Sequence, residues 1–172
     1  MPHLKASLLA LVALVPVSAQ VMHYVPMAPG AVPQVAKFTV ANSGSNFLIT
    51  APNGTTSTVA KAAALTQSVT VFALPANSIV TECVMKTGTA FAGTTTLTAT
   101  LGVTGSLTGC ISTAYDLNAT VSATNISGVG LTSPVISVAG TNLLLALTGT
   151  VSNLSSISAG SVTIWITWHT LP

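Results

Sequence analysis

Apolar and polar residues alternate with a period of two along much of the chain after residue 36. A two-residue period places neighbouring side chains on opposite faces of an extended strand. Residues 94–103 show it most clearly. Their predicted inward face consists of Leu97, Ala99, Leu101 and Val103, and their outward face of Thr96, Thr98 and Thr100. The segment is therefore predicted to be a strand with one buried and one hydroxyl-lined face.

The same reasoning predicts further strands at 37–40, 47–49, 68–73, 78–86, 110–117, 120–126, 133–138, 142–150 and 161–170. Val69 and Val71 are expected on one face of the third of these. In 78–86 the expected inward residues are Thr81, Cys83 and Met85, and the outward ones Glu82 and Lys86. In 161–170, Val162, Ile164 and Ile166 share one face and Trp165 takes the other.

Three segments carry more particular expectations. Residues 143–147 are apolar at every position, which predicts a strand covered on both faces. The alanines of 59–65 favour a short helix. Gly128 and Gly130 predict a turn after the strand at 120–126.

The spacing of the strands predicts the fold class. They recur about every 10 to 15 residues with Gly, Asn or Pro between them, a pattern typical of all-β domains. We expect an antiparallel two-sheet sandwich of jelly-roll or Greek-key type over residues 35–172. The length of 172 residues fits one such domain.

The first 34 residues do not show the alternation that predicts strands. Residues 8–15 are an apolar run that includes Leu8, Leu9, Leu11, Val12 and Leu14. Prolines at 26, 29 and 33 then disfavour helix, so residues 1–34 are predicted to be an extended apolar arm that packs against a neighbouring subunit. The alternative is a signal peptide at 1–19, cleaved after Ala19 and followed by a linker.

Charge is scarce. The charged residues are Lys5, Lys37, Lys61, Lys86, Glu82 and Asp116, which gives a net charge of +2. So few charges protect a protein poorly against association, which indicates a subunit of something larger. The four lysines are dispersed, so nucleic acid is not an expected partner.

The sequence offers little from which to build a catalytic site. It has two carboxylates, and His3, His23 and His169 lie far apart. We find no metal-ligand spacing, phosphate-binding loop or nucleophile elbow. We therefore expect no enzyme, with no catalytic, cofactor-binding or metal-binding residues and no small-molecule substrate.

Two residue pairs remain as candidates. Cys83 and Cys110 fit a disulfide in an exported protein, worth about 3 kcal/mol, or two buried thiols in a protein assembled inside a cell. Trp165 and Trp168, on the last strand, are expected to pack at an interface, because aromatic residues are enriched there. A weaker alternative is that they stack on carbohydrate together with Tyr115.

Several stretches carry a resemblance to a known group of proteins. They are LPANSIVT at 74–81, TGTAFAGTTTL at 87–97, YDL at 115–117 and AGSVTIWIT at 159–167. Together they resemble virion proteins of tailed bacteriophages over about residues 68–172. The resemblance implies a small β-sandwich that decorates a head or forms part of a fibre, commonly as a trimer, without catalytic residues.

The sequence thus favours a virion structural protein. We expect a capsid decoration (cement) or fibre subunit, located in the virion as a homotrimer and bound to the major capsid protein or other virion subunits through its arm. The alternative is an extracellular or cell-surface protein, an exported filament or adhesin subunit with a cleaved signal peptide and bridged cysteines.

Overall fold

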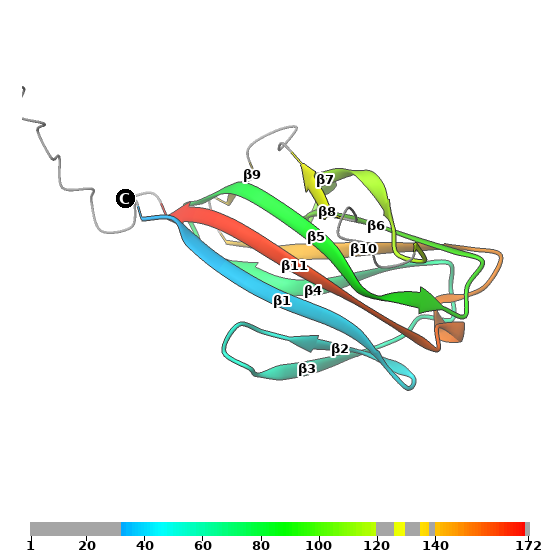
Figure 1. Cartoon of the computed structure of the whole chain (residues 1–172). Helices are drawn as coiled ribbons and strands as arrows, with labels where there is room; N and C mark the ends of the chain where they lie inside the picture. Colours follow the sequence, from blue (N-terminus) through cyan, green and yellow to red (C-terminus); the bar gives the residue numbers. More distant parts are fainter. Residues whose placement is uncertain (1–31, 120–125, 130–134, 138–139, 171–172) are drawn as a thin grey trace, which may run out of the picture.

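The computed structural model describes residues 32–119, 126–129, 135–137 and 140–170 (Figure 1). Within these ranges the chain is almost entirely β-strand, which confirms the predicted fold class. The predicted arm lies outside the described residues up to residue 31, and so does nearly all of the strand expected at 120–126.

The elements follow one another closely along the chain. They are β1 (Gln34–Ser43), β2 (Asn46–Thr50), β3 (Thr56–Ala60), β4 (Thr66–Leu74), β5 (Ser78–Ala92), β6 (Thr96–Val103), β7 (Ser106–Asp116), β8 (Ile126–Val129), β9 (Val135–Ser137), β10 (Thr141–Thr150), the short 3-10 helix η1 (Leu154–Ser156) and β11 (Ala159–Thr170). All the strand pairs are antiparallel.

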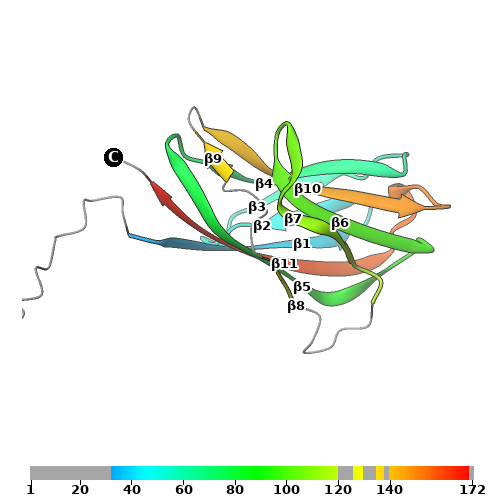
Figure 2. The ribbon, with the colours of Figure 1, turned by 90° about the horizontal axis from the view of Figure 1, so that it is seen from above.

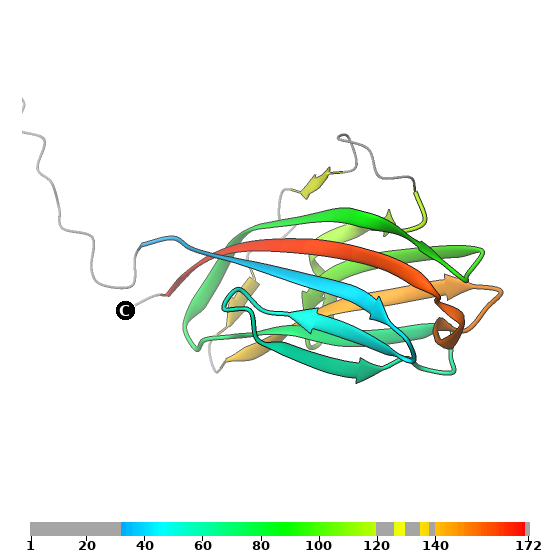
Figure 3. The ribbon, with the colours of Figure 1, turned by 60° about the horizontal axis from the view of Figure 1, so that its bottom comes forward.

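The strands form two sheets that face each other (Figure 2). The seven-stranded sheet has the order β3-β2-β1-β11-β5-β8, and β9 pairs with β5 farther along the same strand. The four-stranded sheet has the order β4-β10-β6-β7. Figure 3 looks onto the larger sheet, which the β2–β3 hairpin extends beyond β1.

The connectivity is that of a jelly roll. With the β2–β3 hairpin set aside and β8 and β9 taken as one interrupted strand, the chain order is β1, β4, β5, β6, β7, β8/β9, β10, β11. In the larger sheet their spatial order is β1, β11, β5 and β8/β9, which are the first, eighth, third and sixth strands along the chain. In the smaller sheet it is β4, β10, β6 and β7, which are the second, seventh, fourth and fifth. This arrangement nests two Greek keys and is the double-sheet jelly roll.

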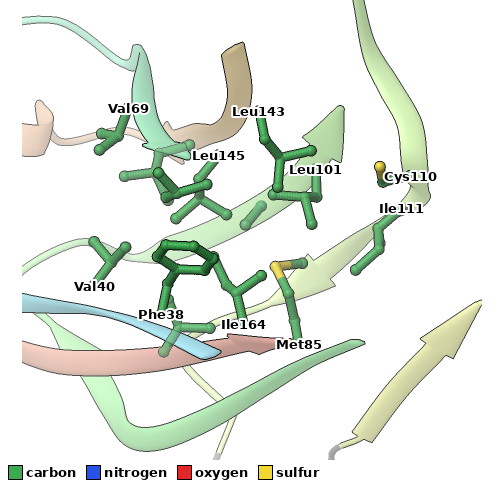
Figure 4. Packing of buried hydrophobic residues seen from close by; sticks show 14 of the residues in the cluster. Phe38, Val40, Val69, Met85, Leu101, Cys110, Ile111, Leu143, Leu145 and Ile164 are labelled. Atoms are coloured by element: carbon green, nitrogen blue, oxygen red, sulfur yellow. The ribbon is translucent and has the colours of Figure 1, made fainter. Parts of the chain in front are cut away.

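The core fills the space between the two sheets (Figure 4). Phe38, Val40, Met85 and Ile164 enter from the larger sheet, whereas Val69, Leu101, Leu143 and Leu145 enter from the smaller one. All eight are at most 2% exposed. The alternation predicted for residues 94–103 is confirmed at Leu97, Ala99 and Leu101, which are buried.

A β-bulge in β5 overturns one predicted orientation. Val80 and Glu82 lie opposite consecutive residues of β11, so Thr81 has no partner in the ladder. The extra residue shifts the alternation by one position. Val80 and Cys83 are consequently buried while Thr81 is exposed, so its predicted inward orientation is wrong. Cys83 and Met85 do point inward as predicted.

Two local predictions are wrong for reasons of pairing. The stretch 59–65 contains no helix: its first two residues belong to β3, where Val59 lies opposite Phe47 of β2. Pairing with a buried strand overrides the weak helix preference of alanine. Gly128 lies within β8 rather than in a turn, because it pairs with Val84 of β5.

The apolar run in β10 is covered on one face only. Leu143, Leu145 and Leu147 are buried between the sheets, whereas Leu144 and Ala146 are half-buried on the outer face. The prediction of cover on both sides is therefore wrong for the described part of a single chain. The sandwich has only two layers, so no third layer covers the outer face of β10.

Candidate interaction surfaces

Apart from Lys61, the charged side chains of the described residues are divided between the sheets. Lys37, Lys86 and Glu82 belong to strands of the larger sheet, and Asp116 ends β7 in the smaller one. Glu82 accepts a 3.3 Å hydrogen bond from the Thr167 hydroxyl. Asp116 accepts a 2.9 Å bond from a nearby backbone N–H at residue 118. Glu82 thus has a partner on the neighbouring strand β11, and Asp116 has one just beyond the end of its own strand.

No group of three or more His, Cys, Asp or Glu side chains within the described residues is placed to hold a metal ion. His169, on β11, is half-buried. In the same part of the chain, no helix has both the length and the apolar character needed to cross a membrane.

The outer face of the smaller sheet carries mainly hydroxyl groups, with Leu144 and Ala146 of β10 among them. On β4, β10 and β6 it presents Thr66, Ser68, Thr70, Thr96, Thr98, Thr100, Thr148 and Thr150. Thr148 of β10 lies between Thr66 and Thr98 in the register. These three strands contain no charged residue. We call this surface the hydroxyl face.

The β6–β7 hairpin folds back against the hydroxyl face at Gly102. A Cβ atom on Gly102 would lie 2.1 Å from the Ser106 carbonyl oxygen and 2.8 Å from the Cα of Leu107. Only glycine permits this close approach. Leu107 remains 39% exposed and lines a hollow of about 440 Å³ together with Ala146.

Two loops run side by side at one end of the sandwich. The Gly149 N–H donates to the Leu65 carbonyl at 2.7 Å, the Leu154 N–H to Ala64 at 2.8 Å, and the Ser155 N–H to Ala62 at 3.0 Å. We call residues 62–65 and 149–155 the apolar double loop. Its exposed apolar side chains are Ala63, Ala64, Leu65 and Val151.

Val151 has an unusual conformation at the tip of the apolar double loop. Its φ is +70°, and the Ser152 N–H donates to the Thr150 carbonyl at 2.8 Å across it. Residues 150–152 therefore form a γ-turn with a positive central φ, the rare and strained form of this turn. A positive φ is especially unfavourable for a β-branched side chain. Val151 is also 84% exposed. A strained, exposed apolar residue marks a candidate contact point.

A buried lysine fixes the base of the apolar double loop. Lys61 is 8% exposed, and its ammonium group donates to the Asn42 side-chain oxygen and to the carbonyl oxygens of Gly44 and Ile157. Burial lowers the pKa of Lys61 below its usual 10.5. Asn42 in turn donates to the Ser158 carbonyl at 2.8 Å. The lysine thereby connects the β1–β2 turn to the segment before β11.

The tryptophans predicted at an interface lie on opposite sides of β11. Trp165 is half-buried on the outer face, with the Lys37 ammonium 5.9 Å from its ring centroid. Trp168 is 6% exposed in the core, and its ring centroid lies 5.0 Å from that of Phe72. The two indoles offer no shared stacking platform in the described part of the chain, and the carbohydrate alternative stays a prediction. Trp165 alone keeps an accessible indole.

The remaining predicted residues have different outcomes. Leu8, Leu9, Leu11, Val12 and Leu14 lie outside the described residues. Cys83 and Cys110 carry free, buried thiols and share a hydrogen bond. Sequence reasoning missed Lys61, Val151 and the apolar double loop. Val151 could not be predicted, because nothing in the sequence indicates that a valine adopts a positive φ.

Comparisons with known proteins identify no family. No protein-family model matches the chain, and no curated protein matches it. Among solved structures, the chain is similar to one described as "Cyanophage Pam1 capsid asymmetric unit", at 18% sequence identity and a TM-score of 0.47. That similarity covers 83% of this chain and 87% of the other.

Proposed function

We propose that the chain is a structural subunit of a bacteriophage virion. In this role it decorates or cements the shell, or forms part of a fibre, as a homotrimer bound to the major capsid protein. The observation that carries the proposal is the apolar double loop, an exposed apolar projection held rigidly on a sandwich with almost no charge. The proposed role uses no catalytic chemistry.

The surfaces of the described residues suit permanent burial by neighbours. Obligate interfaces are more apolar than transient ones and contain few charged residues at their centres. The hydroxyl face and the apolar double loop together provide a surface of this kind. The jelly roll is also a fold of viral capsid domains, although lectins and cupins share it.

The position of the apolar double loop allows one subunit to contact two neighbours. The chain enters β1 beside the end of β11, since Gln34 lies opposite Trp168. The apolar double loop lies at the other end of the sandwich, just before β11 begins (Figure 1). Residues 1–31 are thus attached at one end and the rigid apolar contact is at the other, an arrangement suited to a bridging subunit.

Substitutions in the apolar double loop test the proposal. Leu65→Asp and Val151→Asp, made together in the full-length chain, should abolish both self-association and co-sedimentation with purified particles. Thr56→Asp and Thr58→Asp, made together, add an equal charge on exposed residues of β3 in the larger sheet and should leave both unchanged. Circular dichroism checks that all variants fold. Unchanged association of the double variant would show that the apolar double loop is not the contact.

The source of the protein separates the virion role from the exported alternative. We expect the chain to co-purify, with Met1 intact, in a particle that contains a much more abundant shell protein. Recovery from the medium or cell surface with residues 1–19 removed, as read by intact mass, would favour the exported subunit and reject the virion proposal.

A further inference from the structure

Strands β5 and β7 belong to different sheets but are joined directly across the interior. The Phe91 N–H donates to the Leu117 carbonyl at 2.9 Å. The Thr87 N–H and hydroxyl both lie 3.3 Å from the Tyr115 hydroxyl. Cys83 and Cys110 form the third link, through a hydrogen bond between their thiols.

The three links occur in the same order along both strands. Residues 83, 87 and 91 of β5 face residues 110 and 115 within β7 and residue 117 just beyond its end. The two strands therefore run alongside each other where the sheets converge, and some of their Cα atoms come within 8 Å of each other. A disulfide needs this proximity, because its Cα atoms are usually less than about 7 Å apart.

Burial places the two thiols out of reach of large reagents. Cys83 is 0% exposed and Cys110 is 1% exposed. The pKa of Cys83 is raised, first by its hydrogen bond to Cys110 and then by burial. Both effects disfavour the reactive thiolate, so oxidation is expected during folding or transient opening rather than in the closed native state. As the native structure then closes, it brings the second sulfur beside the one that has reacted.

We infer that Cys83 and Cys110 form one intrachain disulfide that joins the two sheets when the protein meets a small disulfide oxidant. With glutathione disulfide, the thiolate of one cysteine attacks and releases one glutathione. The second thiolate then displaces the other glutathione from the mixed disulfide. One S–S bond forms in the protein, the oxidant becomes two glutathione molecules, and the two cysteine protons end on the released thiols.

The bridge restrains the unfolded chain. It closes a loop from residue 83 to residue 110 that contains β6 and the connections on both sides of it. Loop closure lowers the conformational entropy of the unfolded state, so the oxidised protein should melt about 10 °C higher than the reduced protein. The inference does not rest on the proposed virion role, because it needs only these two strands and an oxidant.

Refolding in the presence of oxidant tests the inference on the full-length chain. One sample is unfolded and refolded with glutathione disulfide and another with dithiothreitol, and both are then denatured, alkylated and weighed. The oxidised sample should lose two hydrogens, accept no alkyl group and remain monomeric on a non-reducing gel. The reduced sample should accept two alkyl groups. Two alkylated thiols, or stable glutathione adducts, after oxidative refolding would overturn the inference.

Single substitutions provide matched controls. In Cys83→Ala and Cys110→Ala the remaining thiol should keep a glutathione adduct or stay free, and oxidation should not raise the melting temperature. An equal rise in melting temperature in either variant would attribute the stabilisation to something other than the bridge, and would also contradict the inference.

Discussion

Lys61 places its ammonium group among three neutral oxygen acceptors, from Asn42, Gly44 and Ile157. Buried lysines usually pair with a carboxylate, but here backbone and amide oxygens take all three protons. The lysine thus contributes through hydrogen bonds to three separate segments. In a chain with four lysines, this one has a structural position that the other described lysines do not share.

Replacing this lysine should destabilise the fold. Lys61→Met keeps most of the aliphatic stem but leaves the three acceptors without their donor, which should lower the free energy of unfolding by about 1 to 3 kcal/mol. Lys37→Met removes an exposed lysine and should change the free energy of unfolding by less than about 0.5 kcal/mol. Urea denaturation measures both. If both variants changed the free energy of unfolding by the same small amount, water would have replaced the ammonium group as the donor to these three oxygens, and the expectation would be wrong.

At the scale of elements, the β6–β7 hairpin depends on a glycine with ordinary backbone angles. Gly102 is buried, and a side chain there would meet backbone atoms of Ser106 and Leu107. The register of the two strands shifts on either side of Leu101 to permit this approach. The hairpin thereby brings Leu107 beside the hydroxyl face.

Alanine at this position should disrupt the hairpin. Gly102→Ala should cost about 3 kcal/mol, because backbone atoms cannot move aside as a side chain can. Gly88→Ala is the matched control: its Cβ would meet only the rotatable Ser161 hydroxyl, at 2.8 Å, and should cost less than about 1 kcal/mol. Thermal unfolding compares the two variants. A Gly102→Ala protein as stable as the control would refute this packing.

The elements also show what the sequence can and cannot predict. Alternation identified β6 and its inward residues correctly, because a regular strand in a two-layer sandwich buries every second side chain. Alternation failed at Thr81, where a bulge shifts it, and the helix preference of alanine failed at Val59, where pairing with β2 decides the structure. Bulges and partners depend on residues far away in the chain, which local pattern does not contain.

The candidate site was harder to predict than the fold. The shortage of charge predicted contact surfaces rather than catalytic clefts, but it did not indicate a particular surface. The apolar double loop combines two segments more than eighty residues apart, and Lys61 reaches Ile157 across a similar separation. Only the fold brings these residues together.

For the whole molecule, the scarcity of charge has a measurable consequence. If neighbours bind through the hydroxyl face and the apolar double loop, association should be nearly insensitive to ionic strength. Between about 0.05 and 0.5 M sodium chloride the dissociation constant should change less than about twofold, because salt screens only charged contacts. Analytical ultracentrifugation measures it. A tenfold weakening would instead assign the contact to the charged side of the larger sheet.

The adjacent ends of β1 and β11 determine where the molecule can be engineered. Because Gln34 lies opposite Trp168, a protein fused after residue 172 would be attached close to the point where residues 1–31 join the sandwich. The β6–β7 turn has free space around Gly105, whose φ of +87° suits glycine. A peptide for surface display is therefore better inserted beside Gly105 than appended to the C-terminus.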